Sequence, residues 1–114
     1  MTHFFTPEEA NRTLPKIRGL IVEIVQVKKK LDYSTGNERK ESLDRISSLT
    51  SKIMEFGVEL KDLDLGLIDF PAMRFDEPVY LCWKLGEDQV LYWHDLATGF
   101  RGRKLLRSEA PLVP

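Results

Sequence analysis

The chain has few of the residues on which disulfide-rich, metal-binding and membrane-spanning proteins depend. Its 114 residues include one cysteine and two histidines. A single cysteine excludes an internal disulfide, and no Cys-x-x-Cys or His-x-x-x-His spacing indicates a strong metal site. The most apolar stretch, residues 19–27, is too short to cross a bilayer, and the N-terminus lacks the pattern of a signal peptide. We therefore expect a cytoplasmic protein without a membrane partner.

An excess of charge of one sign is also missing. Seventeen Lys and Arg residues face eighteen Asp and Glu residues, so the formal net charge is −1. This balance provides no overall attraction to nucleic acid, which we do not expect as a partner. Nucleic-acid binding stays an alternative function only if local basic residues share one face. The candidates for such a face are Arg101, Arg103, Lys104, Arg107 and the run Lys28 to Lys30.

The residues that are present indicate one globular domain, residues 1–114. Hydrophobic residues make up 42% of the chain and charged residues 31%, which is an ordinary globular composition. The periodicity of the apolar residues changes near Gly57. Residues 1–57 have helical spacing, residues 58–98 have strand spacing, and residues 99–114 are predicted to form a basic loop and tail.

The first helix has a recognisable start. Thr6 suits the N-cap, a proline suits the first helical position, and Glu9 completes a capping box. Pro15 lacks the amide hydrogen that a helix interior needs, and it disfavours helical geometry at the preceding residue. The sequence therefore predicts a short capped helix over residues 7–13, a bend, and a long helix over residues 15–33.

A second helix is predicted over residues 38–56, with Gly36 ending the first helix and Asn37 capping the second. Each helix carries an apolar stripe with spacings of three and four. The stripes are Leu14, Ile17, Ile21, Ile24 and Leu31 in the first helix, and Leu43, Ile46, Leu49, Ile53 and Phe56 in the second. Two such helices form an antiparallel hairpin. Since one small sheet would not cover both stripes, we expect a homodimer or higher oligomer.

The second half contains short apolar segments separated by glycine and proline, which is typical of an antiparallel β-meander. The segment from residue 81 to residue 94 holds both tryptophans, the cysteine and one histidine. A two-residue loop at its tip would pair Leu81 with His94, whereas a three-residue loop would pair Cys82 with His94. We favour the first register because it gathers one apolar face. The predicted fold class is α+β.

One group of residues could form a small-ligand or metal site, possibly catalytic, around the sheet and the C-terminal loop. The candidate ligand-binding residues are Trp83, Glu87, His94, Arg101 and Arg103. A divalent metal would take the imidazole of His94 and the carboxylate of Glu87, although we expect no cofactor. A fork of arginines between glycines could instead hold a phosphate or carboxylate.

Structural interpretations compete with each of these candidates. Cys82 is most simply a small buried hydrophobic residue, since a nucleophile needs a nearby base and a lowered pKa. Asp69 could pair across the sheet with Lys84, which requires no catalysis. The absence of catalytic spacing favours a non-enzymatic protein.

Four segments of the chain are distinctive. They are "FTPEEAN" followed by "LP", "GLIDFPA", "YLCWKLGE" and "YWHDLATGFRGRKLL". In this order, and over nearly the whole chain, they resemble the uncharacterised prokaryotic family called domain of unknown function 2203. The resemblance implies a small bacterial or archaeal cytoplasmic protein with no established activity, and it supplies no catalytic residues. The leading functional hypothesis is therefore a non-enzymatic, oligomeric interaction or assembly module that contacts itself or an unknown protein partner.

Overall fold

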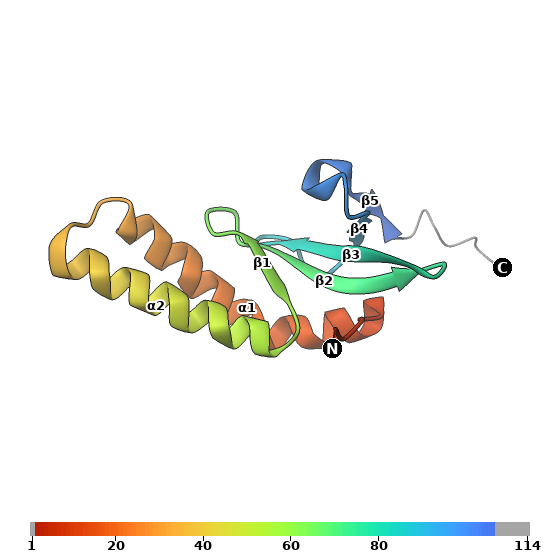
Figure 1. The fold of residues 1–114 in the computed structure, drawn as a ribbon, viewed down its shortest axis with the longest axis horizontal. Coiled ribbons are helices and arrows are strands. Elements are labelled where there is room, and N and C mark those ends of the chain that lie inside the picture. The colour runs from red at the N-terminus through yellow and green to blue at the C-terminus, as the bar shows by residue number, and fades with distance from the viewer. Residues whose placement is uncertain (1, 107–114) are drawn as a thin grey trace.

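The computed structural model describes residues 2–106, which form two helices followed by a five-stranded sheet. The elements are α1 (Pro7–Leu31), α2 (Gly36–Glu55), β1 (Glu59–Asp62), β2 (Leu67–Arg74), β3 (Glu77–Lys84), β4 (Tyr92–His94), the 3₁₀ helix η1 (Gly99–Gly102) and β5 (Lys104–Leu105). Figure 1 shows α1 and α2 side by side, with the sheet beside the N-terminal part of α1 and the far end of the helical hairpin projecting beyond it. The predicted α+β class is confirmed.

Helix α1 begins as predicted but does not break where predicted. The amide of Glu9 donates to Thr6 Oγ1 at 3.1 Å, and the amide of Thr6 donates to Glu9 Oε1 at 3.0 Å, which completes the capping box. The expected bend is wrong, because Pro15 lies inside one continuous helix. An interior proline costs ~3 kcal/mol. Burial of the nearby Leu14 and Ile17 contributes ~1.5–3 kcal/mol each, which is enough to offset that cost.

The junction between the helices also differs from the prediction. Helix α1 ends at Leu31, two residues before the expected end, and α2 begins at Gly36, two residues before its expected start. Thr35, not Asn37, is the N-cap of α2, and its side chain makes no capping hydrogen bond. Gly57 adopts a positive φ of 83° just after α2, as expected for a glycine that ends a helix.

The strands form an antiparallel meander in the order β1-β2-β3-β4-β5. Strand β5 lies in the segment that the sequence predicted to be loop, where Lys104 pairs with Trp93 and Leu105 with Tyr92. The C-terminal part of the predicted basic tail, including Arg107, lies outside the described residues.

Both predicted registers of the β3–β4 hairpin are wrong. The observed pairs are Tyr80 with His94, Leu81 with Trp93 and Cys82 with Tyr92. The connection over residues 85–91 is therefore much longer than a tight turn. The buried Val90 lies within this connection and is bonded to the Asn11 side chain on α1. The Val90 amide donates to Asn11 Oδ1 at 2.7 Å, and Asn11 Nδ2 donates to the Val90 carbonyl at 3.2 Å. A two- or three-residue loop would prevent these contacts with α1.

The hydrophobic core lies between the sheet and the helices. Its largest fully buried side chains include Trp83, Phe70, Ile68, Ile17, Ile21, Ile24, Leu49 and Ile53. All five stripe residues of α1 are buried within one copy of the chain, whereas Leu43 and Phe56 of the α2 stripe are 48% and 39% exposed. The stripe of α1 therefore does not require a second copy, and the expected oligomer stays a prediction. Within residues 2–106, neither helix is long and apolar enough to cross a membrane.

Candidate functional site

Three buried residues with ligating side chains meet on the face of the sheet that points away from α1. Asp69 lies on β2, Cys82 on β3 and His94 on β4, and all three are 3% exposed or less. Successive strand residues point to opposite faces. Because the apolar neighbours of these residues, such as Phe70 and Trp83, point into the core, the three polar side chains share the opposite face.

His94 is held through both ring nitrogens. Nδ1 lies 2.7 Å from the carbonyl oxygen of Asp95, and Nε2 lies 3.1 and 3.2 Å from the two carboxylate oxygens of Asp69. A carbonyl only accepts, so Nδ1 must carry a hydrogen. In the neutral imidazole, Nε2 then carries a lone pair, which faces the carboxylate of Asp69. A cation, either a proton or a metal ion, is required between Nε2 and Asp69.

The electrostatics of the cluster do not fit a nucleophilic cysteine. Burial raises the pKa of Asp69, and the charge of His94 opposes that rise. Burial, followed by the nearby Asp69 carboxylate, raises the pKa of Cys82 to about 12, so that Cys82 is a thiol near neutral pH. With both nitrogens of His94 already engaged, no described group acts as the base that a nucleophilic thiol needs.

An arginine covers the sulfur side of the cluster. Arg103 Nη1 lies 3.7 Å from Cys82 Sγ and donates to Glu87 Oε1 at 3.1 Å, while Nη2 donates to Glu87 Oε2. The Arg103 guanidinium also stacks 3.9 Å above the centre of the Tyr92 ring and 4.5 Å from that of Phe100. These contacts fix the position of the guanidinium and exclude solvent from the thiol.

The structure brings together only part of the predicted site. Glu87 and Arg103 form an ion pair, and the Glu87 carboxylate also accepts the Lys84 amide. The carboxylate of Glu87 therefore does not share a site with the imidazole of His94, whose partner is Asp69. The Trp83 ring lies in the core with its Nε1–H bonded to the Glu87 carbonyl, and Arg101 is exposed on η1.

The predicted ion pair between Asp69 and Lys84 is wrong. Asp69 lies opposite Cys82, while Lys84 lies opposite Leu67. Sequence reasoning did not place Asp69 beside His94, because these residues are 25 positions apart and meet only through two strand registers. The only signal in the sequence was Asp69, a single acidic residue in the otherwise apolar residues 67–73 of β2.

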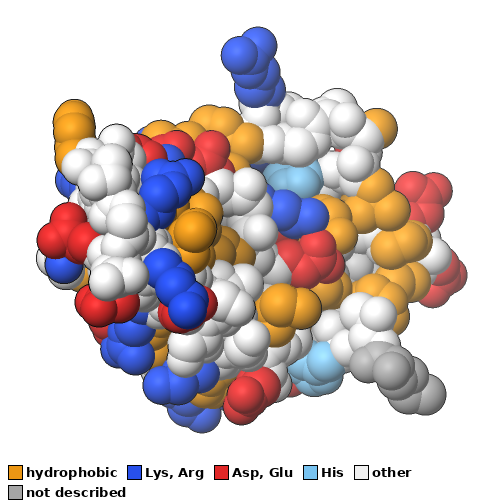
Figure 2. Space-filling view, turned by 60° about the vertical axis from the view of Figure 1, so that its left-hand side comes forward, with side chains coloured by type: hydrophobic (Ala, Val, Ile, Leu, Met, Phe, Trp, Pro, Cys, Tyr) orange, Lys and Arg blue, Asp and Glu red, His pale blue; other side chains and the backbone are white. Residues whose placement is uncertain are grey.

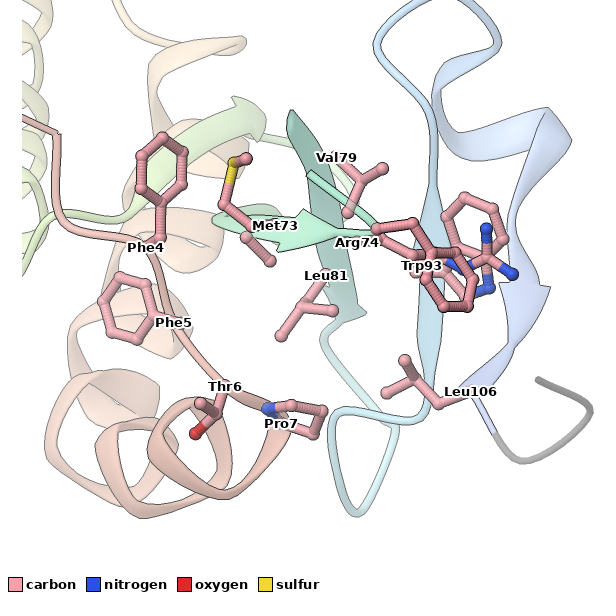
Figure 3. Close-up of a pocket in the computed structure, with 12 residues that line it drawn as sticks. Phe4, Phe5, Thr6, Pro7, Met73, Arg74, Val79, Leu81, Trp93 and Leu106 are labelled. Atoms are coloured by element: carbon pink, nitrogen blue, oxygen red, sulfur yellow. The ribbon is translucent and has the colours of Figure 1, made fainter. Parts of the chain in front are cut away.

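A second feature is an apolar groove on the opposite face of the sheet, where Leu81 and Trp93 lie next to Cys82 and His94 in the chain. A cavity of about 350 Å³ lies between the N-terminal segment, the β2–β3 turn and β4. Figure 3 shows Phe4 and Met73 on one side of this groove, with Leu81 between them and Trp93. Phe4, Met73 and Phe75 line the groove and remain 44%, 47% and 83% exposed. Clustered exposed apolar side chains of this kind mark interaction surfaces.

The groove is bordered by a turn with unusual backbone angles. Phe75 and Asp76 have φ of 49° and 66°, in the left-handed region that a bulky aromatic residue rarely adopts. Arg74 and Lys104 lie over the Trp93 ring, at 4.3 and 5.0 Å from its centre. Among residues 2–106, the Trp93 Nε1–H is buried without a hydrogen-bond partner. The two-residue hairpin between Arg74 and Glu77 requires positive φ at both positions, whereas a bulky residue at such a position and a buried unsatisfied donor are both uncommon.

Comparison with known proteins reaches the family level. No curated protein and no solved structure matches the chain. The family described as "Uncharacterized conserved protein (DUF2203)" matches residues 3–106, which include α1, α2, the whole sheet and both features described above. The chain belongs to this family of uncharacterised conserved proteins, DUF2203.

Proposed function

We propose that the protein is a non-enzymatic assembly module that associates with a second copy of itself through the apolar groove and the adjoining β2–β3 turn. The observation that carries the proposal is Phe75, an aromatic side chain that is 83% exposed and held at a positive φ beside an apolar groove. The two-residue β2–β3 hairpin requires a positive φ at this position, but glycine or asparagine suits that angle better than phenylalanine, and an exposed phenyl ring does not stabilise one isolated copy. Contact with another copy would bury the ring and offset both costs.

The shape and the charges of this surface support pairing with a second copy. Phe75 projects beside a groove whose lining is mainly aromatic and aliphatic. Asp76 and Glu77 are exposed at the turn, and the exposed Lys104 lies on the other side of Trp93. In a two-fold dimer each patch meets its own copy. Phe75 of each copy would then enter the groove of the other, with the acidic turn near Lys104.

The experiment is sedimentation equilibrium at micromolar concentrations with wild type, Phe75→Asn and Tyr33→Asn. Asparagine adopts the left-handed region more readily than phenylalanine, so Phe75→Asn should fold at least as well as wild type. A central aromatic contact is commonly worth ~2 kcal/mol or more, so the dimer dissociation constant should rise ~30-fold or more. Tyr33 is 92% exposed at the far end of the helical hairpin and serves as the matched control.

Three results would contradict the proposal. They are a monomeric wild type, a Phe75→Asn variant that dimerises as tightly as wild type, and a Tyr33→Asn variant that is equally weakened. A synthetic peptide of residues 107–114 that bound the groove of monomeric protein would assign the groove to this segment instead. A charge exchange adds a positive test, since Glu77→Lys should weaken the dimer and the further change Lys104→Glu should restore it.

Nucleic-acid binding remains the weaker alternative. Lys28 is bonded to Asp32 and Asp64 at 2.9 Å, and Arg103 is bonded to Glu87, so these two basic side chains are already neutralised by acids. On the face shown in Figure 2, Lys and Arg side chains are interspersed with Asp and Glu side chains. Such an arrangement favours solubility over binding to a phosphate backbone. The expected location in a cytoplasm also stays a prediction.

A further inference from the structure

We propose that Asp69, Cys82 and His94 form a binding site for one divalent transition-metal ion of the zinc class. The possible ligand atoms, a carboxylate oxygen, Cys82 Sγ and a ring nitrogen of His94, all lie within 4.8 Å of one another. The three side chains are buried, and they come from three adjacent strands of one sheet. Rigid strands hold ligands more accurately than loops, so the cluster has the form of a built site.

The orientation of His94 is that of a metal ligand. Its Nδ1–H is bonded to the carbonyl of Asp95 at 2.7 Å, which leaves the lone pair of Nε2 pointing at Asp69. Metal-bound histidines are typically held in this way, through a carbonyl or carboxylate on the other nitrogen. The cation that the contact between Nε2 and Asp69 requires would then be the metal ion.

The donor set selects the class of metal. One sulfur, one nitrogen and one carboxylate oxygen suit Zn²⁺ and its spectroscopic substitute Co²⁺, whereas Mg²⁺ and Ca²⁺ prefer oxygen ligands alone. With Cys82 bound as a thiolate and Asp69 ionised, two negative charges neutralise the divalent ion. A buried site tolerates such a neutral arrangement far better than an unpaired charge.

The surroundings support a bound thiolate. Arg103 Nη1 lies 3.7 Å from Cys82 Sγ, and its own charge is balanced by Glu87. The three protein ligands leave the fourth position of a tetrahedral zinc ion for water or an external ligand. The proposed site keeps His94 as a metal ligand, but its other protein ligands are Asp69 and Cys82 in place of Glu87.

The experiment is titration of the full, tag-free chain with Co²⁺, followed by competition with Zn²⁺. Cys82 is the sole cysteine of the chain, so a thiolate-to-cobalt charge-transfer band can arise only from this residue. We expect that band, together with the intense visible bands of tetrahedral Co²⁺, to saturate at one ion per chain. Addition of Zn²⁺ should remove both sets of bands.

Variants identify the remaining ligands. Asp69→Asn and His94→Gln should each weaken Co²⁺ binding more than ~100-fold, since even the groups that only orient a ligand are worth ~10- to ~100-fold. Cys82→Ser should remove the charge-transfer band. His3→Gln is the matched control, because His3 is exposed and contacts Glu9 instead. Circular dichroism of each variant verifies that it is folded.

The wild-type spectrum decides the proposal even where a variant fails to fold. Absence of the charge-transfer band at saturating Co²⁺ would overturn it, as would binding that is lost in His3→Gln or unchanged in folded His94→Gln. In either case the cation between His94 and Asp69 is a proton. The result is independent of self-association, because the groove and the metal cluster use different residues and are measured by different methods.

Discussion

Gly66 combines a left-handed backbone with close packing against the core, so its replacement by alanine should strongly destabilise the fold. It has a φ of +64° in the turn between β1 and β2, and this turn packs against α1. A Cβ atom at this position would lie 2.8 Å from the Cβ of Leu85, 3.1 Å from Ile21 Cγ2 and 3.2 Å from Val25 Cγ2. The first distance is shorter than side chains tolerate, and a Cβ cannot move away without its backbone.

Two costs add to the expected loss. A left-handed backbone costs an alanine ~1–2 kcal/mol relative to glycine. Overpacking of a filled core costs a further ~1–3 kcal/mol. Gly66→Ala should therefore lower the free energy of unfolding by ~2–5 kcal/mol, a large part of the ~5–15 kcal/mol that holds an ordinary domain folded. At about 4 °C per kcal/mol for a chain of this size, the melting temperature should fall by ~8–20 °C.

Two other glycines separate these costs. Gly99 has a φ of +62°, close to that of Gly66, and a Cβ atom added there would meet no heavy atom within 4 Å, so Gly99→Ala should show the backbone cost alone. Gly19 lies in α1 with the same open space, and Gly19→Ala should stabilise the protein by ~1 kcal/mol through helix propensity.

Differential scanning calorimetry and urea unfolding of the three variants provide the measurement. The expected order of melting temperatures, from highest to lowest, is Gly19→Ala, wild type, Gly99→Ala and then Gly66→Ala. If Gly66→Ala loses no more stability than Gly99→Ala, the close packing of the β1–β2 turn against α1 is wrong.

The remaining predictions concern the helix caps and the buried thiol. Thr6→Ala should destabilise the protein by ~1 kcal/mol in urea unfolding, and Thr35→Ala by much less, because only Thr6 makes a side-chain capping bond. The hydrogen bond from the Thr6 backbone lowers the pKa of Glu9. The contribution of the Glu9 carboxylate to folding stability is therefore present above the usual pKa of 4.5 and is lost as the pH falls through the lowered pKa. Melting temperatures measured over a pH series should show this dependence in wild type and not in Glu9→Gln. In metal-free protein a pKa of about 12 against the usual 9.0 leaves Cys82 almost entirely as a thiol, and burial also shields it, so alkylation at pH 8 should be ~100-fold or more slower than in denaturant; comparable rates would contradict the buried thiol.

The sequence by itself determined the features that depend on near neighbours. The capping box of Thr6 and Glu9 joins residues three positions apart, and the glycine at position 57 ends α2 through its own backbone freedom. The apolar stripe of α1 follows from helical spacing, and the meander follows from short strands that succeed one another directly in the chain. These local signals were sufficient for the α+β class.

Only the tertiary structure decided where long-range contacts compete with local preference. Pro15 stays inside α1 because the side chains around it are buried, and the β3–β4 connection is long because Asn11 of α1 binds Val90. Each register determines which polar residues become neighbours, since strand pairing brings together residues far apart in the chain. Asp69 and His94 therefore had no shared signal in the sequence, and their contact exists only once the sheet has formed.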